Sequence, residues 1–143
     1  MLKRFIPAAV AAASLAGLAF ASPANAEAMS DNLEYGCAAG DFCMYSTEVI
    51  SAGTKIGIGR GEDYGPVSVA NSQYKGVRSF FNNGTHDPYD YDYVLVTYVY
   101  SNGAEYSKCI PRALNGDLKR GHRTVDSPVT VTWIQWRREG CAK

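Results

Sequence analysis

Hydrophobic and polar positions beyond residue 36 form short β-like runs that are separated by turn residues. Three of the separators contain Asn-Gly, a pair whose backbone preference suits tight reversals. The expected strands are residues 42–47, 55–58, 67–70, 77–81, 93–100, 105–110 and 128–136, and the Asn-Gly turns lie at 83–84, 102–103 and 115–116. Short strands at this spacing predict an all-β fold, a compact antiparallel sandwich.

Hydrophobic and polar positions alternate most clearly in the last of these runs, over residues 129–136. Its aliphatic face switches near Trp133. Such a switch predicts a β-bulge or a strand that is buried on both faces. No segment beyond residue 36 keeps a sustained apolar period of 3.6, so helix is expected only as one short turn within residues 112–118.

The first 26 residues have a different character. Lys3 and Arg4 precede an apolar run over residues 5–21, and a small-residue segment then ends at Ala26. These are the three parts of a secretory signal peptide. We therefore predict a signal peptide at 1–26, a flexible leader at 27–36 and a single domain at 37–143, secreted to the extracellular medium. No second apolar run reaches the length of a membrane span, so no membrane contact is expected after cleavage.

The four cysteines, Cys37, Cys43, Cys109 and Cys141, all follow the predicted signal peptide. An even number in a short exported chain indicates two disulfides, for which three connectivities are possible. The simplest is a local Cys37–Cys43 loop and a long-range Cys109–Cys141 bridge. Zinc ligation is the weaker alternative, because the histidines lack finger-like spacing to the cysteines.

The charge balance and the lack of known motifs argue against several classes of function. The chain carries 14 Lys and Arg against 14 Asp and Glu, whereas nucleic-acid-binding domains are usually basic, so no nucleic-acid partner is expected. The glycine-rich segment 57–61 lacks the spacing of a phosphate loop. His86 and His122 lie among turn and basic residues and belong to no catalytic motif. The acidic, tyrosine-rich segment 87–93 could assist a hard cation, but solvated acids are the simpler interpretation. We predict no enzyme activity, no bound metal and no cofactor.

Three motifs carry a resemblance to a known family. They are CAAGDFCMY at 37–45, VRSFFNNGTH at 77–86 and YSKCIP at 106–111. Together they resemble the Streptomyces metalloproteinase inhibitor family, which comprises secreted actinobacterial peptidase inhibitors, and the likeness spans residues 35–136. That family has a βγ-crystallin-like fold of two four-stranded Greek-key motifs. The resemblance therefore implies a two-Greek-key sandwich for this chain.

The resemblance also implies a function. Members inhibit thermolysin-like zinc endopeptidases through a rigid, substrate-like loop whose sensitive bond follows a cysteine. Carried onto this chain, the bond is Cys109–Ile110, flanked by Lys108, Pro111 and Arg112. Ile110 would supply the bulky apolar residue that such enzymes favour after the bond. A rigid loop is hydrolysed slowly because the surrounding fold keeps the cut ends together. We expect a monomer whose partner is an extracellular peptidase.

A second interpretation stays open. The chain could be a non-inhibitory βγ-crystallin-like module, either a killer-toxin-like effector or a surface-binding protein that uses the segment 87–93. Many βγ-crystallin motifs bind calcium through acidic residues shortly before a serine. Here Tyr74 and Lys75 stand at those positions before Ser79, so we expect no calcium at that site.

Overall fold

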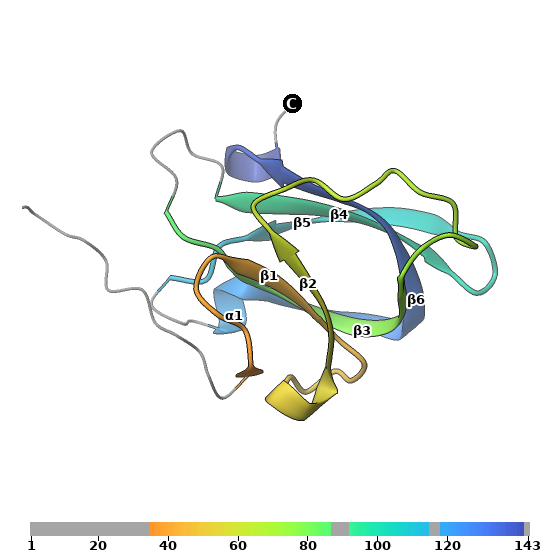
Figure 1. Cartoon of the computed structure of the whole chain (residues 1–143), viewed down its shortest axis with the longest axis horizontal. Helices are drawn as coiled ribbons and strands as arrows, with labels where there is room; N and C mark the ends of the chain where they lie inside the picture. Colours follow the sequence, from red (N-terminus) through yellow and green to blue (C-terminus); the bar gives the residue numbers. More distant parts are fainter. Residues whose placement is uncertain (1–34, 87–91, 115–117, 142–143) are drawn as a thin grey trace, which may run out of the picture.

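The computed structural model describes residues 35–86, 92–114 and 118–141. These residues form six β-strands with short helical turns between and after them (Figure 1). The elements are β1 Asp41–Tyr45, η2 Ala52–Thr54, β2 Lys55–Arg60, β3 Tyr74–Asn83, β4 Tyr93–Tyr100, β5 Glu105–Pro111, α1 Leu118–Gly121, β6 His122–Arg137 and η3 Glu139–Cys141. The predicted signal peptide, the leader up to residue 34, most of segment 87–93 and the predicted turn at 115–116 lie outside the described residues.

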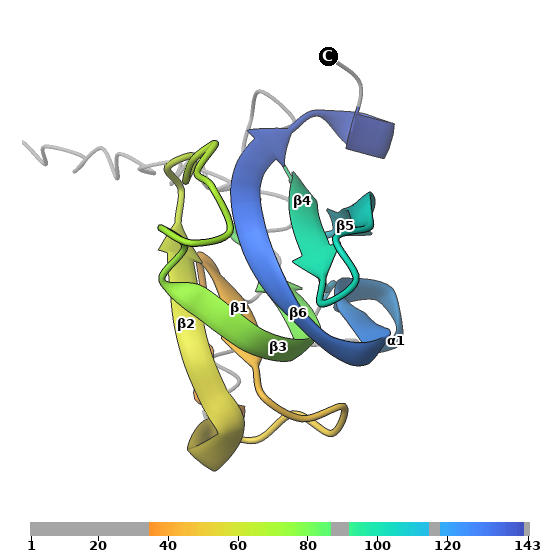
Figure 2. The same cartoon turned by 90° about the vertical axis from the view of Figure 1, so that its right-hand side faces the viewer.

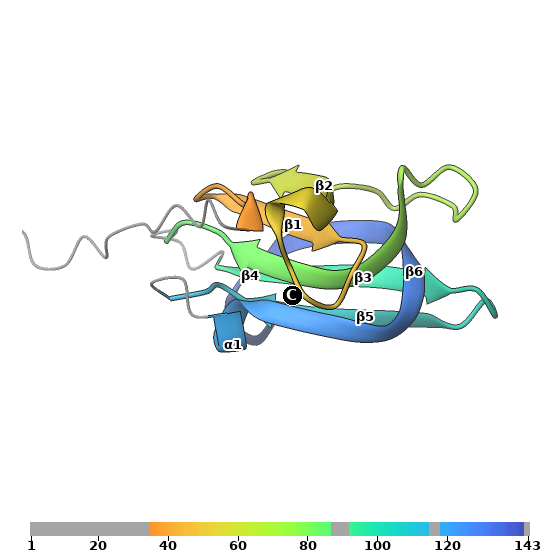
Figure 3. The ribbon, with the colours of Figure 1, turned by 90° about the horizontal axis from the view of Figure 1, so that it is seen from below.

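The six strands join one antiparallel sheet in the order β2-β1-β3-β6-β4-β5. The 16-residue β6 is shared by both halves, because its residues 122–131 pair with β3 and its residues 129–137 pair with β4. Figure 2 shows β1, β2 and β3 on one side, β4 and β5 on the other, and β6 passing between them. The sheet therefore folds over itself into two layers, which are seen from below in Figure 3. The predicted all-β class is confirmed.

β6 changes layer at an irregular stretch. Thr124 pairs with Ser79 and Val129 pairs with Val77, so four residues of β6 stand opposite a single residue of β3. Pro128 lies in this stretch and has no N–H for a ladder hydrogen bond. A second irregularity lies against β4, where the register skips Thr132. This confirms the bulge predicted near Trp133.

The chain between β2 and β3 crosses from one layer to the other. Tyr64 and Ile134 exchange two backbone hydrogen bonds of 2.9 Å, and the Val67 N–H donates to the Thr132 carbonyl at 3.0 Å. The strand predicted at 67–70 is wrong, because residues 69–71 form a turn. The apolar alternation was misleading there, since Val69 remains 44% exposed.

Two apolar clusters occupy opposite faces of β1. Phe42 and Met44 point into the space between the layers, whereas Cys43 and Tyr45 point outward, as strand alternation requires. The larger cluster contains Phe42, Met44, Val77, Phe80, Val94, Val96, Tyr98, Ile110, Val125, Val129, Val131 and Ile134. The smaller contains Cys37, Cys43, Tyr45, Ile50, Phe81 and Ala113. All five residues of β1 are consequently buried.

Both predicted disulfides are formed. Cys37, which lies just before β1, bonds to Cys43 within β1. Cys109 of β5 bonds to Cys141 of η3. Disulfides persist in oxidising compartments, which agrees with a location outside the cytosol. Within the described ranges, no helix is long and apolar enough to cross a bilayer. Among the residues that the structure describes, the one α-helical turn, α1, begins at Leu118, the last residue of the span in which it was predicted.

Candidate functional site

The segment predicted as an inhibitory loop, residues 108–112, is the end of a strand rather than a loop. Lys108, Cys109, Ile110 and Pro111 belong to β5, and Arg112 follows it directly. β5 is the last strand in the sheet order, and among the described strands it pairs with β4. The Cys109–Ile110 bond is therefore held in an edge strand by a regular antiparallel ladder.

Ile110 is a core residue. Its side chain is fully buried in the larger apolar cluster. Its carbonyl accepts a hydrogen bond of 3.0 Å from Asn82 Nδ2, which also donates to the Asp92 carbonyl at 3.1 Å. The sequence motif indicated an exposed apolar contact at this position. The structure turns the side chain inward because alternate residues of β5 face the opposite layer.

A disulfide and an ion pair fix the C-terminal end of β5 to the rest of the fold. Cys109, on the opposite face from Ile110, is bonded to Cys141, which lies 32 positions later in the chain. Arg112 is only 9% exposed, and its Nε lies 3.3 Å from Asp92 Oδ2 at the start of β4. The same carboxylate oxygen lies 3.1 Å from His86 Nδ1. In this arrangement Arg112 anchors the chain where β5 ends.

Lys108 connects the two layers. Its half-buried side chain reaches across from β5, and Nζ donates a hydrogen bond of 2.8 Å to the Thr124 carbonyl of β6. Pro111 closes the strand and offers no backbone N–H to a partner. An incoming chain would therefore find ladder donors on β5 only before Pro111.

The remaining motifs are not brought into a catalytic arrangement in the described part of the chain. His86 is exposed, whereas burial and the neighbouring Arg123 lower the pKa of His122 below its ordinary value. The described residues hold no group of three or more His, Cys, Asp or Glu side chains that could bind a metal. Gly57, in the glycine-rich segment, allows a close approach, since a Cβ there would lie 2.7 Å from the Tyr74 ring.

The sequence motifs gave no indication of a hollow that three tyrosines line. Tyr98 and Tyr100 share a face of β4, and Tyr106 of β5 stands directly opposite Tyr98. The ring centroids lie 5.7 Å apart for Tyr98 and Tyr100, 5.6 Å for Tyr100 and Tyr106, and 6.4 Å for Tyr98 and Tyr106. We call these three residues the tyrosine cluster. Two tyrosines at i and i+2 before an Asn-Gly turn, with a third in register after it, were the available signal.

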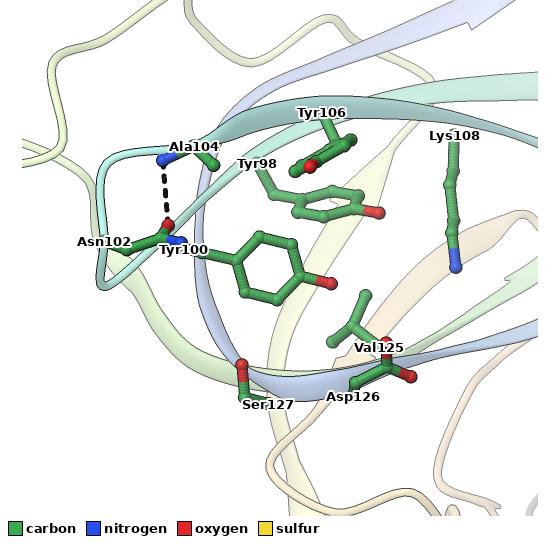
Figure 4. A pocket seen from close by; sticks show the side chains of 9 residues that line it. All are labelled: Tyr98, Tyr100, Asn102, Ala104, Tyr106, Lys108, Val125, Asp126 and Ser127. Carbon is green, nitrogen blue, oxygen red and sulfur yellow. Dashed lines mark hydrogen bonds between the residues drawn. The ribbon is translucent and has the colours of Figure 1, made fainter.

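The tyrosine cluster lines a cavity of about 510 Å³ between the β4–β5 hairpin and the middle of β6 (Figure 4). Tyr98 lies deepest of the three, with 2% of its surface exposed. Burial, together with the neighbouring Tyr100, raises the pKa of Tyr98 to about 12. Tyr98 therefore presents a neutral hydroxyl group to the cavity near neutral pH.

Comparison with known protein families, curated proteins and solved structures finds no match to this chain.

Proposed function

We propose that the protein is a secreted inhibitor of an extracellular peptidase, of the zinc endopeptidase class that its motifs suggest, and that it binds the enzyme through the exposed edge of β5. The observation that carries this proposal is the setting of the Cys109–Ile110 bond. It lies in an edge strand of the sheet order, beside a disulfide to the C-terminal turn. The protein acts by binding and performs no catalysis.

Peptidases bind their substrates in extended form, and an edge strand offers that form without further ordering. Residues 105–111 pair with residues 93–99 of β4 in an unbroken register. Because Ile110 is buried, the enzyme meets the backbone of β5 and its outward side chains, not the isoleucine side chain. This replaces the insertion of Ile110 into an enzyme pocket that the family resemblance suggested.

Resistance to cleavage follows from the same contacts. If the Cys109–Ile110 bond were hydrolysed, the new ends would stay in place, one through the disulfide to Cys141 and the other through the core packing of Ile110. The hydrogen bond from Asn82 to the Ile110 carbonyl adds to this restraint. Product release would then be slow, which is the property that makes a substrate-like segment an inhibitor.

We further propose that the two layers correspond to two Greek keys of a βγ-crystallin-like sandwich. Support comes from the equivalence of the two halves of the chain. In the first, β3 returns to lie beside β1 of the β1–β2 hairpin, and in the second, residues 129–137 of β6 lie beside β4 of the β4–β5 hairpin. In each half the third segment joins the other layer: Tyr64 pairs with Ile134, and residues 122–124 pair with β3. The return of the fourth segment to lie beside the first supports a Greek-key connection in each half.

The test is a titration of the mature protein, residues 27–143, against a thermolysin-like enzyme. We expect stoichiometric loss of peptidase activity and slow appearance of a new N-terminus at Ile110. Replacing Cys109 and Cys141 together by alanine should turn the inhibitor into a faster-cleaved substrate. The matched control replaces Cys37 and Cys43 by alanine, which also removes one disulfide but leaves β5 fastened.

Two results would count against the proposal. One is an absence of inhibition against metallo-, serine and cysteine endopeptidases alike. The other is equal inhibition and equal cleavage rates for the two disulfide variants, with both shown to be folded by circular dichroism. The second result would leave inhibition intact and move the contact away from β5.

A further inference from the structure

The cavity at the tyrosine cluster combines a buried base with an exposed aromatic wall. Tyr98 and Val125 are almost fully buried, at 2% exposure each, whereas the Tyr106 side chain is 55% exposed. An exposed aromatic ring at the mouth of a hollow contributes little to the stability of the fold, since most of its surface stays in water. It is, however, well suited to cover the apolar face of a ligand.

The rim of this cavity carries both hydrogen-bond donors and acceptors (Figure 4). Lys108 uses one of its three N–H groups on the Thr124 carbonyl and has two others to offer. The Asn102 side-chain oxygen accepts from the Ala104 N–H at 3.0 Å, which leaves its NH₂ group for another partner. The Asp126 carboxylate and the Ser127 hydroxyl are exposed and supply acceptors.

The charges in the rim balance, because Lys108 and Asp126 carry opposite charge. A strongly anionic or cationic ligand therefore gains no net attraction there. Tyr100 contacts Tyr98 and Tyr106 edge to face, at interplanar angles of 77° and 84°. An aromatic cage for a quaternary ammonium instead turns the faces of its rings toward the cation.

A second hollow lies on the other side of Tyr100. It has a volume of about 250 Å³ and is lined by Tyr100 together with Val99, Gly103, Pro128 and Thr130, among others. Tyr100 is thus a shared wall between two adjacent hollows at the β4–β5 turn. A ligand made of linked units could occupy both.

From these observations we propose that the tyrosine cluster and the adjoining hollow bind an uncharged oligosaccharide. Each sugar ring has an apolar C–H face that suits the exposed ring of Tyr106, and hydroxyl groups that can both donate to Asp126 and accept from Lys108 and Asn102. A cavity of about 510 Å³ is of the size that holds a small ligand. This site shares Tyr106 and Lys108 of β5 with the strand proposed to meet the peptidase, but the sugar proposal does not rest on the proposed inhibition.

The experiment is isothermal titration calorimetry of the mature protein with cellotetraose, maltotetraose and the tetramer of N-acetylglucosamine. We expect saturable binding of at least one tetrasaccharide, with weaker binding of its monosaccharide because the second hollow is then empty. Tyr106→Ala should raise Kd by about tenfold or more. Asp126→Asn, which retains the size of the side chain, should raise it by a smaller factor.

Ile56→Ala is the matched control. Ile56 is also a large side chain on an edge strand, 41% exposed, but it lies in β2 at the other end of the sheet order. Its Kd should equal that of the wild type. The proposal is overturned if no tetrasaccharide binds at about 10 mM, or if Tyr106→Ala binds as tightly as the Ile56→Ala control. Binding of a tetra-alanine peptide in preference to all three sugars would overturn it in favour of a peptide site.

Discussion

Replacing Ile110 by alanine tests whether the residue after the proposed sensitive bond packs in the core or is available to contact a peptidase. The Ile110 side chain is fully buried within the larger apolar cluster. The substitution removes three buried carbon atoms. Burial of each away from water contributes about 0.8 kcal/mol, so their loss lowers the free energy of unfolding by about 2.4 kcal/mol. The cavity left behind raises the expected loss to about 3–4 kcal/mol. That is a large share of the stability of a small domain.

The assay is urea unfolding of the mature protein, followed by the fluorescence of Trp133 and Trp136. The urea concentration at the midpoint of unfolding should fall. The slope of the unfolding free energy against urea concentration should stay unchanged. Glu105→Ala is the control, because Glu105 is exposed at the start of the same strand and should change stability by no more than about 0.5 kcal/mol. A loss below about 1 kcal/mol for Ile110→Ala would refute the core assignment. The isoleucine would then be free to enter an enzyme pocket.

Other predictions follow from single positions. Gly65→Ala should destabilise the protein more than Gly103→Ala in the same urea assay: both glycines have positive φ, but only at Gly65 would a Cβ meet a backbone oxygen, at 2.3 Å. Equal losses would contradict this. The pKa of His122 is lower in the folded than in the unfolded protein, so the unfolded state binds the imidazole proton more tightly. The free energy of unfolding should therefore fall as the pH drops below about 6.5. In the His122→Gln variant the free energy of unfolding should depend less on pH in that range. Removing the Cys109–Cys141 bridge should cost about 3.7 kcal/mol by loop entropy, measured by unfolding of the double alanine variant, and a cost near zero would refute the estimate.

Local pattern was sufficient for much of the fold. The β4–β5 hairpin was predicted almost to the residue, because two β-like runs flank an Asn-Gly turn whose backbone preference is local. The disulfides followed from an even cysteine count and one short interval. The bulge at Thr132 was visible because it shifts the apolar positions to the other face of the same strand.

Pairing between distant segments was decided only by the tertiary structure. Residues 67–70 alternate like a strand, but residues 69–71 form a turn and Val69 stays 44% exposed, which could not be foreseen without the whole sheet. Ile110 belongs to a motif that suggests exposure, yet its direction is set by which layer lies across from β5. Likewise, Lys108, Asp126 and the tyrosine cluster meet only because β6 bends between the layers. A side chain's neighbours across two layers depend on long-range register, which one strand's own sequence does not encode.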